Sequence, residues 1–370
     1  MADVVVVGGG VIGCAVAFFL ARAGADVSLL ERGGLAGEAS GAAAGMLAAL
    51  SDEGGDRGPA FQKLCLDSQA LYEKILPELE STGIDLRYRR TGVLHVALDR
   101  TEADDLRDRF ERQQKLAPDH LQWVEGEALR REEPEVNPAA VAGYVSPAEH
   151  YLDPQRLVLA FAEGARRAGA LIETERPVQG FVRRNGRVNF IRTPGRLVEA
   201  GQVVLAGGPW TAALARRLGS YVPVRPVRGQ MLALAGPATP LRRVIWGKKA
   251  YLVPRENNLT FVGATVETVG YRKRNTIAAV NRLRSGANSL VPGLALARQR
   301  SAWAGLRPGT PDRLPVLGRL PGWENVWVAT GHFRNGILLA PITGQIMAEA
   351  VVSGRMPVGL DAFSPARFAD

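Results

Sequence analysis

The stretch that decides the fold lies near the start of the chain and reads DVVVVGGGVIGCAVAFFLARAGADVSLLE, residues 3–31. Residues 3–7 are a short β-branched run, residues 11–23 have the length and composition of a helix, and residues 26–30 are apolar again. A strand, a glycine turn, a helix and a second strand in this order form a βαβ unit, in which the two strands are parallel. We therefore expect an α/β protein that begins with a Rossmann-like domain.

The glycines of the turn, Gly8, Gly10 and Gly13, have the spacing G-x-G-x-x-G. In a dinucleotide-binding fold the first makes the tight turn, the second lets a pyrophosphate approach the backbone, and the third lets the helix pack on the strand. The helix N-terminus then presents free N–H groups to the phosphates. Glu31, eighteen residues after Gly13, ends the second strand and can accept hydrogen bonds from ribose hydroxyls. Its negative charge argues against a 2′-phosphate and hence against NADP, so NAD and FAD remain as candidates.

Two further segments are candidates for contact with a ligand. Residues 37–46 are mostly small, which permits a close approach of backbone to a ligand, although an ordinary tight loop has the same composition. Residues 331–336 are a glycine-bounded turn between an apolar strand at 326–329 and a helix that we expect to end near Val352. The start of such a helix can stabilise a developing negative charge. A nicotinamide-dependent enzyme has no evident need of this second site.

The rest of the chain mixes helices and strands. We expect helices at residues 59–79, 101–116 and 154–169, a hairpin of 181–184 and 187–192 around Asn185-Gly186, and strands at 92–98, 203–205, 231–234, 251–253 and 259–262. The βα pattern occurs at the start, in the middle and at the end, with mixed strands between, which favours two interleaved domains. We place the cofactor domain at 1–80, 148–221 and 310–370, and a substrate domain with a mixed, largely antiparallel sheet at 81–147 and 222–309.

The composition is that of a globular protein. The 370 residues are 46% hydrophobic and 22% charged, which argues against a disordered or collagen-like chain. The net charge of +9 resides in residues 242–300, which hold twelve Lys or Arg and two Glu. Such a segment attracts an anionic substrate or partner, or is simply a solvated face. No nucleic-acid recognition motif accompanies it, so we expect no nucleic-acid partner.

The N-terminus and the cysteines bear on the compartment. The apolar run 4–20 has no preceding Lys or Arg and is interrupted by three glycines, unlike a signal peptide or a spanning helix. Cys14 and Cys65 are too few for a disulfide scaffold. We expect a cytoplasmic protein with no membrane partner, and no metal site, because the four histidines lack metal-ligand spacing.

Five segments together resemble the FAD-dependent D-amino-acid oxidase family. They are the opening fingerprint and residues 42–47, 251–255, 304–310 and 331–339, and they cover nearly the whole chain in the expected order. Within that family they resemble most the glycine oxidase branch, which supplies a glycine-derived imine to thiazole synthesis in thiamine biosynthesis. The resemblance implies FAD as cofactor. Because no cysteine follows Cys65, covalent attachment to a late cysteine, as in monomeric sarcosine oxidase, is excluded, and we expect the FAD to be non-covalent.

The resemblance also implies site residues. Arg307 would grip the substrate carboxylate with help from Tyr251, and Arg334 would sit near the amine or flavin end. Val178 would touch the adenine side through its backbone. The residues implied to contact FAD are Gly8, Gly10, Val11, Ile12, Gly13, Glu31, Arg32, Ala39, Ser40, Ala44, Gly45, Met46, Val178, His332, Phe333, Arg334, Asn335, Gly336, Ile337 and Leu338.

These roles are physically reasonable but do not follow from spacing alone. A guanidinium pairs with a carboxylate through two parallel hydrogen bonds and so fixes the position of the α-carbon. Without the resemblance, however, Arg307 before a proline reads as a loop salt bridge, Tyr251 as a packing residue of a strand, and His332 as a structural residue rather than a general base. The sequence departs from the branch at Val266, where a methionine can lie near the substrate, and at Lys249, beside Tyr251.

The expected reaction is oxidation of glycine, then of sarcosine and small D-amino acids, by hydride transfer to the flavin. The imine would hydrolyse to glyoxylate and ammonia, and oxygen would be reduced to hydrogen peroxide. The alternatives are a dehydrogenase of the same family that reduces a quinone or dye, an NAD-dependent dehydrogenase, and a non-catalytic module that binds a partner such as a thiazole-synthesis enzyme. We expect a homo-oligomer whose ligands are a small amino acid and oxygen.

Overall fold

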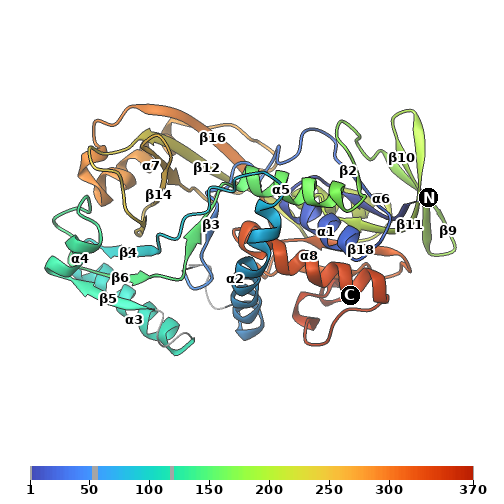
Figure 1. Ribbon diagram of the computed structural model, residues 1–370, viewed down its shortest axis with the longest axis horizontal. Helices are drawn as coiled ribbons and strands as arrows, with labels where there is room; N and C mark the ends of the chain where they lie inside the picture. The colour runs from blue at the N-terminus through green and yellow to red at the C-terminus, as the bar shows by residue number, and fades with distance from the viewer. Residues whose placement is uncertain (1, 52–56, 117–120, 370) are drawn as a thin grey trace.

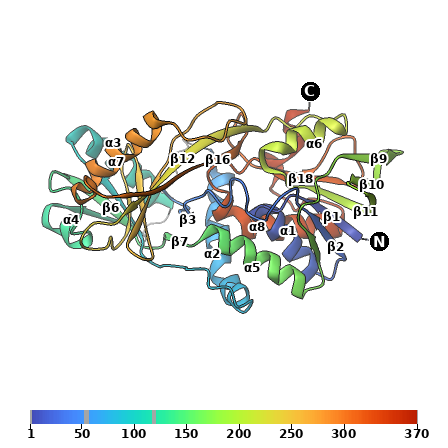
Figure 2. The same cartoon turned by 90° about the horizontal axis from the view of Figure 1, so that it is seen from above.

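A computed structural model describes residues 2–51, 57–116 and 121–369, and it confirms the predicted α/β class. Two large sheets lie towards the two ends of an elongated molecule, with α2, α5 and the short strands β3 and β7 between them (Figures 1 and 2). The bounds of the central helices are Pro59–Glu80 for α2 and Pro154–Arg167 for α5. Strands β3, Met46–Leu47, and β7, His150–Tyr151, pair with each other.

The first sheet contains the predicted βαβ unit. Its strand order is β17-β18-β11-β1-β2-β8, and the hairpin β9–β10 extends it from β11. Strand β1 is parallel to both β2 and β11, and Val7 is in register with Leu30 and Leu205. The carboxyl ends of these strands therefore meet at one edge, where ligands of open α/β sheets bind. The strands are β1 Ala2–Val7, β2 Val27–Leu30, β8 Leu171–Glu173, β9 Gly180–Arg184, β10 Arg187–Thr193, β11 Arg196–Leu205, β17 Val316–Arg319 and β18 Val326–Thr330.

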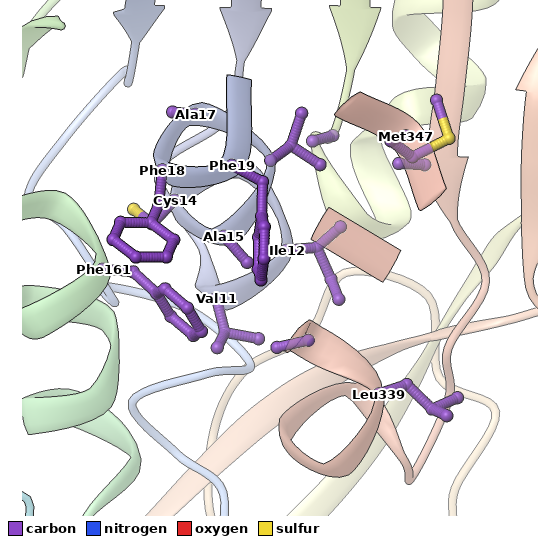
Figure 3. Close-up of a cluster of buried hydrophobic side chains, with 14 of the residues drawn as sticks. Val11, Ile12, Cys14, Ala15, Ala17, Phe18, Phe19, Phe161, Leu339 and Met347 are labelled. Atoms are coloured by element: carbon purple, nitrogen blue, oxygen red, sulfur yellow. The ribbon is translucent and has the colours of Figure 1, made fainter. Parts of the chain in front are cut away.

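Helix α1, Val11–Arg22, is the centre of the first core. All its residues except Arg22 are buried, because α5 packs on one side and α8, Gly336–Ser353, on another. Figure 3 shows the side chains that fill these contacts, among them Ile12, Phe18, Phe19, Phe161, Leu339 and Met347. By length and composition α8 passes as a membrane span, but 67% of it is buried inside the protein, as in a core helix.

The second sheet has the order β16-β12-β15-β14-β13-β4-β6-β5 and is antiparallel except for the pair β13–β4. Its strands are β4 Val93–Ala97, β5 Gln122–Glu125, β6 Ala142–Ser146, β12 Arg225–Ala235, β13 Val244–Trp246, β14 Tyr251–Arg255, β15 Leu259–Gly263 and β16 Gln299–Gly309. The remaining helices are α3 Arg100–Leu116, α4 Gly126–Glu132, α6 Thr211–Arg217 and α7 Ile277–Leu290, with 3-10 turns at Gly208–Trp210, Pro292–Leu294, Asp361–Phe363 and Pro365–Phe368.

The predicted elements differ from the observed ones mainly in length. Strands β11 and β12 extend well beyond the apolar runs 203–205 and 231–234 on which the prediction rested. Their outer parts are held by ladder hydrogen bonds to β10 and β16 rather than by a hydrophobic face, so no periodic pattern marks them. We propose that the two sheets correspond to the two interleaved domains expected from the sequence.

The start of α8 is tied to α2 by two hydroxyl groups. Pro341 has no N–H, so it cannot donate to the carbonyl of Ile337, four residues earlier. Tyr72 of α2 donates to that carbonyl at 2.5 Å instead, and Ser68, one turn earlier on α2, donates to the carbonyl of Leu338 at 2.6 Å. Both hydroxyls are buried, so α2 fixes the position at which α8 begins.

We expect Tyr72→Phe to lower the free energy of unfolding by about 1–3 kcal/mol, because the buried carbonyl of Ile337 loses its donor. Urea unfolding measures this loss, and Tyr88→Phe, whose hydroxyl meets the exposed Glu73, is the matched control with a smaller effect. In a Pro341→Ala background the new N–H can satisfy Ile337. The loss caused by Tyr72→Phe should then shrink, and an equal loss in both backgrounds would contradict this account.

Candidate functional site

A cavity of about 440 Å³ lies between the two sheets and is lined by residues from both. The first sheet contributes the carboxyl ends of β1, β2, β11 and β18 and the starts of α1 and α8. The second sheet contributes β12, β13, β14 and β16. Segment 38–48 forms a further wall. The opening glycines and the turn at 331–336, far apart in sequence, therefore meet in one cavity.

The start of α1 forms one wall through close backbone packing. A side chain at Gly13 would place its Cβ 1.9 Å from the carbonyl oxygen of Gly8, so only glycine lets the helix approach the strand this closely. Gly10 precedes the helix and offers no side-chain cap, while the N–H of Val11 donates to Ser40 Oγ at 2.9 Å. The helix N-terminus is thus directed at the cavity, as the fingerprint predicts.

Glu31 is held at the rim of the cavity by two backbone groups. Its carboxylate accepts hydrogen bonds from the N–H of Gly9 at 2.6 Å and from the N–H of Gly33 at 2.9 Å. These bonds fix the orientation of the carboxylate without neutralising its charge. An acceptor that is held in place at the end of β2 fits ribose hydroxyls, so the donor and acceptor set of this wall fits a dinucleotide.

The structure brings together nearly all the residues implied by the resemblance. Every one of them lines the cavity except Gly13, which packs behind it against β1. Their individual roles stay predictions. Several other residues line the cavity without any signal in the sequence, since their positions depend on strand pairing or on the turn after β11. They include Trp210, Leu214, Arg217, Gly229, Met231 and Trp246.

Arg307 has no carboxylate partner among the residues that the structure describes. It lies on β16, where its Nη1 donates to the carbonyl of Thr265 at 2.9 Å and Tyr251 lies beside it. In the parts of the chain that the structure describes, neither Arg307 nor Arg334 has a carboxylate within 4.0 Å. Burial lowers the pKa of Arg307, although the Tyr251 hydroxyl opposes this shift. Two unpaired guanidinium groups at one cavity favour the binding of an anion there.

Gly229 provides the surface on which Arg307 rests. A Cβ at this position would lie 2.2–2.3 Å from the Nη1, Nη2 and Cζ atoms of Arg307. The guanidinium is therefore stacked flat against the backbone of Gly229, on the neighbouring strand β12. One edge meets the Thr265 carbonyl, which leaves the rest of the planar group available to a ligand.

Among the described residues that line the cavity, no titratable base lies beside Arg307. His332 is buried, its Nε2 lies 3.0 Å from Thr343 Oγ1, and burial lowers its pKa to about 3. Its imidazole is therefore neutral at ordinary pH and cannot take up a proton there. The only carboxylates that line the cavity among the described residues are Glu31 and Glu38, which lie with the nucleotide-binding segments.

Other positions singled out in the sequence lie elsewhere. Val266 is 58% exposed and Lys249 is exposed, and neither lines the cavity. The basic segment 242–300 does not form one free positive face, because several of its cations are engaged. These are Arg243 with Glu132, Lys248 with Asp105, Lys273 with Glu38, and Arg255 with the carbonyls of Leu152 and Ala44.

Comparisons with known proteins agree with this architecture. The family described as DAO, FAD dependent oxidoreductase, matches residues 3–350. A glycine oxidase of Geobacillus kaustophilus is 36% identical over 99% of this chain and 97% of its own length. A crystal structure of glycine oxidase from that organism covers 100% of this chain with 33% identity and a TM-score of 0.93.

In a longer relative, a segment similar to this chain is one part of a fused protein. The bifunctional protein ThiO/ThiG of a Nostoc strain is 35% identical over 99% of this chain, but this chain spans only 55% of the length of the fused protein. The chain thus belongs to a family whose cofactor is FAD, not NAD.

The buried His332 makes stability depend on pH. Its folded pKa of about 3 lies below the ordinary value of 6.5, so between these values only the unfolded chain binds the proton. Stability must therefore fall as the pH is lowered, by about 1 kcal/mol per pH unit from this residue. We expect His332→Gln to reduce the slope of unfolding free energy between about pH 6.5 and about pH 5 by this amount. Urea unfolding at several pH values measures it, and an unchanged slope would contradict the burial of a neutral imidazole.

Proposed function

We propose that this chain, which belongs to the DAO family of FAD-dependent oxidoreductases, oxidises glycine and other small amino acids, such as sarcosine and small D-amino acids, to imines. FAD-dependent amine oxidation in general follows from its glycine oxidase relatives. The observation that supports a small amino acid as substrate is the unpaired, positioned guanidinium of Arg307 at the wall of the cavity.

In this proposal Arg307 binds the substrate carboxylate. The stacking on Gly229 and the hydrogen bond to Thr265 fix its plane before the substrate arrives, so little side-chain freedom is lost on binding. A two-point contact then orients the α-carbon as well as attracting the anion. Tyr251, whose pKa is raised by burial, stays protonated beside Arg307 and can donate to the same carboxylate.

The reaction needs little from the protein beyond binding and orientation. FAD, when bound, would supply the acceptor for a hydride from the α-carbon and the route by which two electrons reach oxygen to give hydrogen peroxide. The walls of the cavity hold the α-carbon in line for this transfer. Because no described carboxylate lies within 4.0 Å of Arg307 and the imidazole of His332 is neutral, we propose that the substrate binds with its amine neutral. With glycine as substrate, water then hydrolyses the imine to glyoxylate and ammonia.

Arg334 and Trp246 would bound the space around the amine. The guanidinium of Arg334 lies 5.7 Å from the ring centroid of Trp246, and the Trp246 ring packs 5.4 Å from that of Tyr251. A second positive charge near the amine disfavours the ammonium form of the substrate. The bulky indole also leaves little room for a side chain on the α-carbon, which is consistent with glycine as substrate.

We further propose that the imine is passed to an enzyme of thiazole synthesis. The support is the fused relative, in which a segment like this chain is joined to a ThiG part. Oligomeric state and cytoplasmic location stay predictions from the sequence.

We expect the purified holoenzyme to be yellow and to bleach anaerobically on addition of glycine, with peroxide released when oxygen is admitted. This follows from two-electron transfer from the substrate to the flavin. Absorbance and a peroxidase-coupled assay measure the two events. Bleaching without peroxide, but with turnover on a quinone or dye, would identify the dehydrogenase alternative, and no bleaching with any small amino acid would refute the substrate class.

Arg307→Ala should weaken glycine binding by about 2–5 kcal/mol, because it removes a charge-assisted pair from a partly desolvated site. The Michaelis constant measures this loss. Arg300→Ala, which removes an exposed arginine from the same strand, is the matched control and should leave the constant unchanged. Equal Michaelis constants for the two variants would show that Arg307 does not bind the substrate.

Gly229→Ala should impair the same step without removing the charge. The new Cβ displaces the guanidinium from its position, so we expect the Michaelis constant to rise by at least about tenfold, with a smaller effect on bound flavin. A crystal structure of the variant would show the moved side chain. A Michaelis constant equal to that of the wild type would show that the stacking on Gly229 does not matter for binding.

A further inference from the structure

Residues 268–276, called the strap below, form the second part of the connection between β15 and α7 and contain the basic run Gly270-Tyr271-Arg272-Lys273-Arg274. We propose that the strap is a latch that closes over the cofactor cleft and slows the release of FAD. This rests on the FAD dependence of the family and not on the identity of the substrate.

The base of the strap is fixed to the second sheet. Just before the strap, Glu267 forms an ion pair with the buried Arg228 of β12. Arg228 Nη1 also donates to the carbonyl of Arg274 at 3.0 Å. At the far end, the N–H of Thr276 donates to Gln230 Oε1 at 2.7 Å. Two residues of β12, Arg228 and Gln230 on either side of Gly229, thus anchor both ends of the strap.

The middle of the strap crosses to the cofactor side at two points. Tyr271 donates its hydroxyl hydrogen to the carbonyl of Pro209 at 2.9 Å, and its ring lies 5.4 Å from that of Trp210. Lys273 donates to Glu38 at 2.9 Å and to the carbonyl of Gly37 at 3.0 Å. These partners belong to two separate segments, one after β2 and one after β11.

The two segments also contact each other. Arg32 lies 3.9 Å above the ring of Trp210 and forms an ion pair with Glu38 at 2.7 Å. All three of these residues line the cavity. Arg32, Glu38 and Trp210 together with the strap residues Tyr271 and Lys273 form a closed ring of contacts at the cavity wall. A nucleotide between the two segments leaves readily only when that ring opens.

The alternation of side chains along the strap supports this role. Residues 271–274 are all exposed, but the side chains of Tyr271 and Lys273 contact the segments after β11 and β2, whereas those of Arg272 and Arg274 have no hydrogen-bond or ion-pair partner among the described residues. The basic run therefore contains two contact positions and two solvent positions. Because the ion pair of Lys273 is more than a third exposed on both sides, it is weak enough to open reversibly.

The test uses the full-length holoenzyme and measures the rate of FAD release after dilution, from the rise in free-flavin fluorescence, with no substrate present. We expect Lys273→Ala to release FAD about two- to fivefold faster at low salt. Tyr271→Ala should release it about three- to tenfold faster. Arg272→Ala is the matched control, since it removes the same charge from a solvent position, and Lys273→Arg should restore slow release.

Salt separates the latch from other causes. At about 1 M salt the Debye length is only about 3 Å, so the difference between Lys273→Ala and the wild type should disappear while that of Tyr271→Ala remains. The proposal is overturned if Lys273→Ala and Tyr271→Ala release FAD no faster than Arg272→Ala does. Thermal unfolding of each apoprotein checks that the variants fold. A holoenzyme that fails to oxidise glycine leaves this result unaffected, because no turnover is measured.

Discussion

The approach of Gly13 to the Gly8 carbonyl is the contact on which the rest of the structure depends. It lets α1 lie directly against the parallel strands, so the start of the helix reaches the carboxyl edge of the sheet. Helices α5 and α8 then pack on α1, and α8 brings the turn at 331–336 to the same edge. A bulkier residue at position 13 would move the helix away and separate the two ends of the cavity.

The cavity is electrostatically polarised, because the carboxylate of Glu31 and the guanidinium of Arg307 are oriented by backbone groups but not neutralised. Glu31 is held by backbone N–H groups, which orient its charge without cancelling it. The carbonyl of Thr265 accepts a hydrogen bond from Arg307, which orients the positive charge without cancelling it. His332, buried without a charged partner, is neutral. Unpaired charges in a partly buried site are costly unless a ligand completes them, so the arrangement favours a ligand with acceptors towards Arg307 and hydroxyls towards Glu31.

The second sheet contributes more than a wall. Strand β12 supplies Gly229, on which Arg307 rests, and its neighbours Arg228 and Gln230 anchor the strap. Because Thr265 accepts the hydrogen bond of Arg307 and precedes the strap by three residues, one short segment serves both the proposed substrate contact and the proposed cofactor latch.

The sequence by itself determined the parts that depend on local chemistry. The strand, glycine turn, helix and strand at the start, Glu31 at the end of β2, and the turn into α8 could be predicted because glycine geometry, β-branched runs and helix ends act within a few residues. Arg307 and Tyr251 entered only through the family resemblance. Only the tertiary structure decided that Arg307 has no acidic partner among the described residues, that it lies on Gly229, that Trp246 and Met231 line the cavity, and that the basic run 270–274 contacts the segments after β2 and β11. The physical reason is that these facts depend on which distant strands pair and in which register, and no local pattern records that choice.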